Sequence, residues 1–282
     1  MTEGEGAPAA IAGQGSQNLM LRVVAALVLA PIAIAIGFAG GWLWTALVTL
    51  ATIGIYLEWL TIVDSARATS VAMAGIITLV LSGALLATGR IESSLMASGL
   101  GLAAVAWLSP GRRGWNAAGL LYASAAATSS VTVRLDHAFG FVALMLILLS
   151  VWVTDIGGYF AGRAIGGPKL WPRVSPKKTW AGALGGLIAS LVVAAGFAAF
   201  DLGKSGPLLL LGAVLSVASQ LGDLFESAVK RRFGVKDSSH LIPGHGGLMD
   251  RLDGFVAAVV LAAIFGFFRG GVDGVGRGLM VW

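Results

Sequence analysis

The stretch Phe139–Gly162, FGFVALMLILLSVWVTDIGGYFAG, decides the fold class of this chain. One acidic residue, Asp155, interrupts it, and it contains no basic residue. A helix needs about 20 predominantly apolar residues to cross the ~30 Å hydrocarbon core of a bilayer. The stretch is therefore long enough to span a membrane, and it predicts a transmembrane helix.

Apolar runs of similar length recur on both sides of this stretch. They lie at 21–38, 41–62, 70–88, 92–109, 116–132, 180–200 and 207–228. A shorter run at 254–268 predicts either a ninth span or a partly inserted helix. The sequence thus predicts an all-α polytopic membrane protein, a bundle of about 8–9 transmembrane helices.

Composition supports a membrane protein over a soluble one. Hydrophobic residues make up 57% of the 282 positions and charged residues 12%, against roughly 25% charged in soluble domains. The absence of cysteine excludes disulfides and thiolate metal sites. We attribute the net charge of +5 to cytoplasmic loops facing anionic lipid, and expect no nucleic-acid partner.

The chain is expected to form one structural unit behind an N-terminal tail. Residues 1–20 are rich in Gly, Ala and Gln and predict a disordered tail. They lack the basic region and cleavage site of a signal peptide, so the first span is expected to stay as an anchor. The helices of 21–138 and the region 139–282 should share one bundle.

Basic residues predict the orientation. With nine spans and a cytoplasmic N-terminus, 14 of the 19 Lys and Arg residues fall on the cytoplasmic side. The five others are Arg90, Arg134, Lys204, Arg269 and Arg277. Two large polar loops, 163–178 and 230–251, then share the cytoplasmic face and can meet.

Four acidic residues lie within or beside spans, where an ionised carboxylate needs a partner or a use. Glu58, near the cytoplasmic end of its span, either extends its side chain to the membrane interface or has a partner or a function. Asp155 serves either a structural ion pair or hydrogen bond, or a function. Asp223 and Glu226 belong to a polar helix face, which is composed of Ser219, Asp223, Glu226, Ser227 and Lys230. A salt-bridge stripe is the alternative, but such a face in a membrane favours an aqueous cavity or a bound ion.

The segment 236–253 adds oxygen ligands and glycines. Asp250 and Asp253 can face one way if a helix begins there, although one of them could be only an N-cap. With Asp223 they form a carboxylate set suited to Mg²⁺. His240 and His245 are alternative ligands, but a zinc-type HExxH pattern is absent.

The loop 163–178 supplies the opposite charge. Its cations Arg163, Lys169 and Arg173 precede Ser175-Pro-Lys-Lys-Thr179, which opens the next helix. Backbone N–H groups at a helix start favour phosphate. An ordinary positive-inside loop is the alternative. No P-loop sequence exists, so metal ligands beside two basic loops point to phosphoryl or nucleotidyl transfer.

These segments resemble the signature of the phosphatidate cytidylyltransferases. The matching residues are Ser227-Ala-Val-Lys-Arg231, Lys236-Asp237, Pro243-Gly-His-Gly-Gly247 and Asp250-Arg-Leu-Asp253. Residues 219–227, Ser175–Thr179 and Asp155-x-x-x-Tyr159 are similar to other family segments, so the resemblance covers about 139–268. One departure is Ala181, where the family usually has Glu.

The resemblance implies an Mg²⁺-dependent enzyme that converts CTP and phosphatidic acid to CDP-diacylglycerol and pyrophosphate in the bacterial inner membrane. One or two Mg²⁺ ions are expected, and a monovalent cation is compatible with the site. The N-terminus and the active-site loops would be cytoplasmic, and the small-residue helix faces are compatible with a homodimer. The implied catalytic residues are Asp223, Ser227, Lys230 and Asp250; the substrate-binding residues are Ser175, Lys177, Lys178, Thr179, Arg231, Lys236, His245, Gly246 and Arg251; the metal ligands are Asp223, Asp250 and Asp253.

Three rival functions remain open at this point. The nearest is a CTP-dependent polyisoprenol kinase or a cytidylyltransferase for another lipid phosphate. A transporter would place acids deep in several spans and break helices in paired positions, whereas the polar residues here lie at cytoplasmic helix ends. A non-catalytic scaffold would leave the carboxylate set unexplained.

Overall fold

The computed structural model describes residues 29–65, 68–109, 111–239 and 247–282. A helix at Leu29–Ala39 precedes α2 (Gly41–Ile62), α3 (Thr69–Ala87), α4 (Ile91–Leu108), α5 (Arg113–Leu135) and α6 (Gly140–Ile165). Strands β1 (Lys169–Trp171) and β2 (Ser175–Thr179) follow. The chain continues through α7 (Trp180–Ala199), α8 (Ser205–Arg232), α9 (Met249–Gly270), a 3₁₀ turn (Val272–Gly274) and α10 (Val275–Met280).

The fold is an all-α polytopic membrane bundle, as the sequence predicts. Seven of the described helices are long and apolar enough to cross a membrane: α2, α3, α4, α6, α7, α8 and α9. The predicted run 21–38 lies partly outside the described residues, and its described part forms the helix Leu29–Ala39. The run 254–268 lies within a full-length helix, because α9 begins at Met249, before the apolar run.

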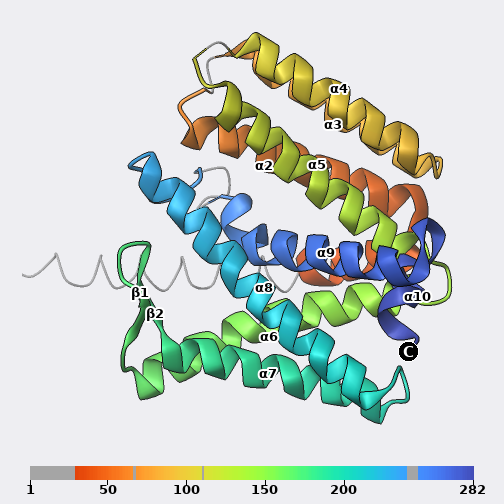
Figure 1. Cartoon of the computed structure of the whole chain (residues 1–282), viewed down its shortest axis with the longest axis vertical. Helices are drawn as coiled ribbons and strands as arrows, with labels where there is room; N and C mark the ends of the chain where they lie inside the picture. The colour runs from red at the N-terminus through yellow and green to blue at the C-terminus, as the bar shows by residue number, and fades with distance from the viewer. Residues whose placement is uncertain (1–28, 66–67, 110, 240–246) are drawn as a thin grey trace, which may run out of the picture.

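Helix α5 has the length of a span but a polar composition. It carries Asn116, Ser124, Ser129, Ser130 and Thr132, and all five are buried. The helix packs against α2, α3, α4, α6 and α9, so protein rather than lipid surrounds much of it (Figure 1). Side-chain hydroxyls can bond back to the helix carbonyls, as Thr132 does to Thr128. A polar helix is therefore tolerated at this place in the bundle.

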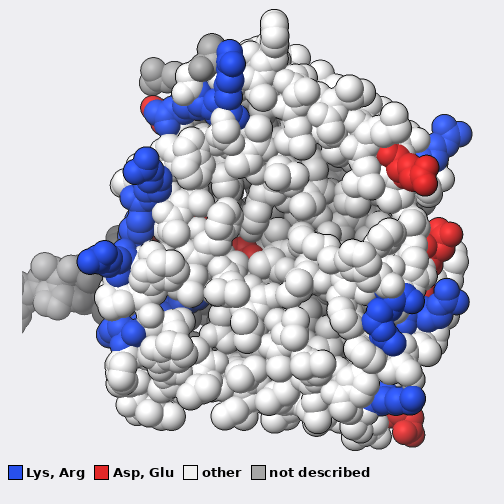
Figure 2. All heavy atoms as spheres, viewed as in Figure 1, with Lys and Arg blue, Asp and Glu red and all other residues white. Residues whose placement is uncertain are grey.

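Successive helices run in opposite directions, which gives the bundle two ends. We call the end that carries the β1–β2 hairpin the hairpin end, and the other the C-terminal end. At the hairpin end, the Arg112 guanidinium and the Trp115 ring both contact Phe233, after α8. At the C-terminal end, Asp136 accepts a hydrogen bond from the Arg277 amide. Figure 2 shows basic side chains at both edges and a broad, mostly uncharged band between them, with an acidic side chain visible in the hollow at its centre.

The polar loop before α7 contains a short antiparallel hairpin that the sequence analysis did not predict. Strands β1 and β2 pair with Lys169 opposite Thr179 and Trp171 opposite Ser175. The hairpin rises from the adjoining ends of α6 and α7, across the direction of these helices (Figure 1). Helix α7 begins directly after Thr179, as expected, and the Thr179 hydroxyl accepts a hydrogen bond from the Gly182 amide at 3.1 Å.

Glycines allow α6 and α7 to pack backbone against backbone. A Cβ atom at Gly182 would lie 2.8 Å from the carbonyl oxygen of Gly158, and one at Gly157 would lie 2.9 Å from that of Gly185. Such small residues permit close helix approach where lipid supplies no hydrophobic drive. This packing fixes the wall from which the site is built.

Candidate active site

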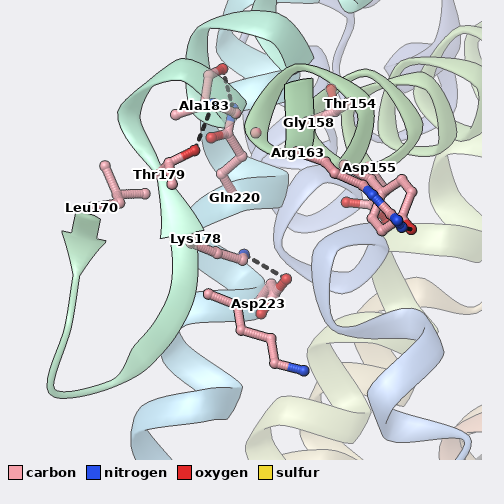
Figure 3. A pocket seen from close by; sticks show the side chains of 14 residues that line it. Thr154, Asp155, Gly158, Arg163, Leu170, Lys178, Thr179, Ala183, Gln220 and Asp223 are labelled. Carbon is pink, nitrogen blue, oxygen red and sulfur yellow. Dashed lines mark hydrogen bonds and ion pairs between the residues drawn. The ribbon is translucent and has the colours of Figure 1, made fainter. Parts of the chain in front are cut away.

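A cavity of about 430 Å³ opens between α6, α7, α8 and the β2 strand. Polar side chains from three elements face it: Asp155 and Arg163 from α6, Lys178 from β2 and Asp223 from α8 (Figure 3). Gly158, Gly162 and Gly182 line its floor and keep the wall free of side chains. Its remaining lining residues are Thr154, Tyr159, Leu170, Lys177, Thr179, Ala183 and Gln220.

An ion pair crosses this cavity. The Lys178 ammonium group contacts the Asp223 carboxylate, which joins the hairpin to α8 (Figure 3). Both side chains are half-buried. The Ser227 hydroxyl donates to the other Asp223 oxygen at 3.4 Å. The basic loop and the acidic helix face, far apart in the sequence, therefore meet here as the topology predicts.

The floor beneath the ion pair is tied together by neutral hydrogen bonds. The Gln220 amide donates to the Ala183 carbonyl at 3.2 Å and to the Ser216 hydroxyl at 3.3 Å. The Thr154 hydroxyl donates to Ser216 at 3.0 Å. These bonds connect α6, α7 and α8 and fix the positions of the three helices relative to one another.

A second charged cluster lies between α8 and α9. The Lys230 ammonium nitrogen is 2.6 Å from Asp250 Oδ1 and 3.3 Å from Glu226 Oε1. Asp250 Oδ2 also accepts hydrogen bonds from the amides of Ser238, at 3.2 Å, and Gly247, at 2.9 Å. Asp250 is thus held by the basic end of α8 and by the chain on both sides of residues 240–246. It does not act as an N-cap, because that position is Leu248.

Asp253 connects the two groups of charges. It interacts electrostatically with Asp155 and Asp223 on the cavity side and lies within hydrogen-bonding reach of Glu226 on the other. These four acids and Asp250 share the site with four basic residues: Arg163, Lys177, Lys178 and Lys230. The site therefore holds acidic and basic side chains in nearly equal number.

The donor chemistry of this site fits a hard cation such as Mg²⁺. All the candidate ligands are carboxylate oxygens, which Mg²⁺ prefers, and the buried Glu226 Oε1 has an ion-pair contact with Lys230 at 3.3 Å but no hydrogen bond among the described residues. Within that same part of the chain, no three acidic or histidine side chains are close enough to share one ion. Lysines instead hold the Asp223 and Asp250 carboxylates.

Glu58 does not extend to the surface of the bundle, so of the two sequence-based interpretations the structure favours a side chain with partners. Its side chain is 1% exposed and accepts four hydrogen bonds from the segment that carries Asp250. Glu58 lies far from the signature residues along the chain, so its contacts with them could not be predicted. The only available signal was an acidic residue within an apolar span.

The structure places the remaining predicted residues as follows. Lys177 and Thr179 line the cavity, and Ser175 is half-buried on β2 outside the lining. Arg231, Lys236 and Arg251 are exposed near the second cluster. His245 and Gly246, like His240, lie outside the described residues.

Asp155 lines the cavity. Tyr159, whose hydroxyl accepts from Arg163 at 2.8 Å, and Gln220 are lining residues to which the sequence analysis gave no role.

Comparison with known proteins extends over most of the chain. The sequence profile described as "Cytidylyltransferase family" matches residues 20–268. A phosphatidate cytidylyltransferase of Brucella suis is 41% identical over 261 residues, which cover 88% of this chain and 93% of the relative. The phosphatidate cytidylyltransferase of Haemophilus influenzae is 46% identical over 148 residues, covering 48% of this chain and 51% of that protein. The phosphatidate cytidylyltransferase of Bacillus subtilis is 43% identical over 131 residues, which cover 45% of this chain and 48% of that protein.

The profile match and the long Brucella alignment confirm the resemblance that the signature residues indicated. The match includes the N-terminal helices, which the sequence analysis could compare only by their hydrophobicity. An integral membrane bundle, two facing sets of charges and this similarity lead to one conclusion: the chain belongs to the cytidylyltransferase family and is a nucleotidyltransferase enzyme.

Proposed function

We propose that this enzyme transfers the cytidylyl group of CTP to phosphatidic acid, giving CDP-diacylglycerol and pyrophosphate. The observation that carries the proposal is the Lys178–Asp223 pair, which places a cation and a carboxylate in one cavity inside a membrane bundle. A nucleotide triphosphate and a lipid phosphate are both polyanions, so the main task of such a site is to bring them together. The similarity to phosphatidate cytidylyltransferases gives the acceptor.

The reaction needs little proton chemistry. A phosphate oxygen of phosphatidic acid attacks the α-phosphorus of CTP, and a new P–O bond forms. The bond between the α-phosphorus and the bridging oxygen breaks, and pyrophosphate leaves with that electron pair. Because the attacking oxygen is already anionic, no strong general base is required, and positioning with charge neutralisation supplies most of the catalysis.

The side chains of the two clusters divide these tasks. Lys178 and Lys177 would neutralise phosphate charge on the cavity side, and Lys230 would do so on the α9 side. Asp223, Asp250 and Asp253 would supply carboxylate ligands to one or two Mg²⁺ ions, and no single ion would take all three in the described arrangement. Bound Mg²⁺ would neutralise charge on the triphosphate. In that state the lysines would exchange carboxylate partners for phosphate oxygens. The hydroxyls of Ser227 and Thr179 would donate hydrogen bonds to phosphate oxygens.

The lipid substrate would enter from the apolar surface beside the cavity. Tyr159, which lines the cavity, and the neighbouring Ile156 and Phe160 are exposed on α6. Trp180 and Leu184 are exposed on α7. In a membrane these side chains face acyl chains, so a phosphate held by Lys178 can keep its acyl chains in the bilayer.

Purified enzyme tests this function directly. With labelled CTP, phosphatidic acid and Mg²⁺ we expect a labelled CDP-lipid and pyrophosphate in equal amounts, and no product when Mg²⁺ is chelated. Parallel reactions contain a polyisoprenol or another lipid phosphate in place of phosphatidic acid. Label transfer to one of those acceptors but not to phosphatidic acid would refute the proposed substrate.

A further inference from the structure

Glu58 on α2 gathers hydrogen bonds from a segment far away in the sequence. One oxygen accepts from the Ser239 hydroxyl at 2.6 Å and the Leu248 amide at 2.8 Å. The other accepts from the Ser238 hydroxyl at 2.9 Å and the Met249 amide at 2.7 Å. Each of these residues lies at least 180 positions from Glu58. The carboxylate therefore ties the residues on either side of 240–246 to α2, and we refer to these described residues, 238–239 and 247–249, as the segment.

These bonds also complete the start of α9. The first amides of a helix have no partner within it, and no side chain of the adjacent Leu248 caps this one. The Leu248 and Met249 amides find the Glu58 carboxylate instead. A buried carboxylate with two amide and two hydroxyl donors at a helix N-terminus is well stabilised.

The held segment in turn orients Asp250. The amides of Ser238 and Gly247 both donate to Asp250 Oδ2, while Lys230 contacts Oδ1. The fit around Gly247 is tight, because a Cβ atom there would lie 2.6 Å from Glu58 Oε2. A movement of this segment relative to α2 must therefore displace the Asp250 carboxylate and its contact with Lys230.

We propose that Glu58 is a positioning residue for the transfer reaction, which acts by holding the segment that orients Asp250 and Lys230. It lies outside the charged clusters and needs no contact with either substrate. The inference rests on the proposed function for its kinetic part. Its structural part, the attachment of the segment to α2, can be measured without any substrate.

The test compares Glu58→Gln with Glu92→Gln in the full-length enzyme. The first change keeps the shape of the side chain but turns one oxygen into an NH₂ group, which cannot accept from two of the four donors. Glu92 is an exposed residue in the first turn of α4, at the opposite end of the bundle. Hydrogen–deuterium exchange in detergent measures the amides of 247–250, and kinetics with CTP and phosphatidic acid give kcat and both KM values.

For Glu58→Gln we expect faster exchange of the Leu248 and Met249 amides and a kcat lowered between about 10- and 100-fold. The KM for phosphatidic acid should change little. The thermal unfolding midpoint should fall, because two buried donors lose their acceptor, and Glu92→Gln should match the wild type in all measurements. Unchanged exchange in Glu58→Gln would overturn the inference. A kcat per folded molecule equal to that of the wild type would also overturn it, since Glu58 would then serve stability alone.

The exchange measurement is independent of the proposed substrate. If the wild type uses another lipid phosphate, the proposed substrate is wrong, but the exchange result still decides whether Glu58 holds the segment.

Discussion

At the scale of single residues, the two aspartates held by lysines are the strongest candidates for catalytic groups. Asp223→Asn and Asp250→Asn keep side-chain size but remove the negative charge. The first removes the carboxylate that Lys178 contacts, and the second removes the shorter of the two carboxylate contacts of Lys230, leaving Glu226 at 3.3 Å. We expect each change to lower turnover by about 100-fold or more, because charge placement supplies most of the catalysis. Initial rates of CDP-lipid formation measure the effect.

The matched control is Asp64→Asn. Asp64 also pairs with a basic residue, Arg112, but its side chain is 90% exposed and the pair lies at the surface. Such pairs contribute about 0–1 kcal/mol to stability, so turnover should equal that of the wild type. Substantial activity in Asp223→Asn or Asp250→Asn would contradict their assignment as catalytic residues.

The sequence predicted the residue types of the site better than their pairing. Helical spacing placed Asp223 and Lys230 on one face of α8, but the structure divides that face between two neighbours. Asp223 turns to Lys178 of the hairpin, and Lys230 turns to Asp250 on α9. The spacing fixes angles around one helix, whereas the partners depend on how three elements pack. For the same reason the role of Glu58 could not be predicted.

At the scale of elements, the α6–α7 contact sets the shape of the cavity wall. A Cβ atom at Gly186 would lie 2.6 Å from the carbonyl oxygen of Thr154, and backbone atoms must move to admit it. We expect Gly186→Ala to lower the free energy of unfolding by about 1–3 kcal/mol. Thermal unfolding in detergent measures this loss, and activity should fall with it because Thr154 lines the cavity.

Gly196 on the same helix is the control, since nothing lies within 4 Å of a Cβ atom built there. Gly196→Ala should be neutral or stabilising, because Gly in a helix interior is about 1 kcal/mol less favourable than Ala. Equal unfolding midpoints for the two variants would show that α6 and α7 are farther apart than the structure has them.

At the scale of the whole molecule, hydropathy predicted most of the fold because a span must be apolar over a fixed length. The predicted spans 41–62 and 180–200 agree with α2 and α7 within one residue. Agreement was poorer where polar residues extend a helix beyond its apolar run. Helix α9 begins five residues before the predicted 254, since its first turn is held by Glu58 and Lys230 rather than by lipid. The hairpin left no signal, because its strands are only three and five residues long.

The orientation of the bundle is the prediction that belongs to this largest scale. The hairpin end carries the two basic loops, and the positive-inside tendency places them in the cytoplasm, where CTP is available. The chain has no cysteine, so single cysteines can report the side of the membrane. Arg173→Cys lies in the hairpin and Lys204→Cys between α7 and α8, and both positions are exposed. In intact cells a membrane-impermeant maleimide should label Lys204→Cys, while Arg173→Cys should react only after the membrane is permeabilised. Labelling of Arg173→Cys in intact cells would place the cavity on the outer side, away from its nucleotide, and would refute both the orientation and the proposed supply of substrate.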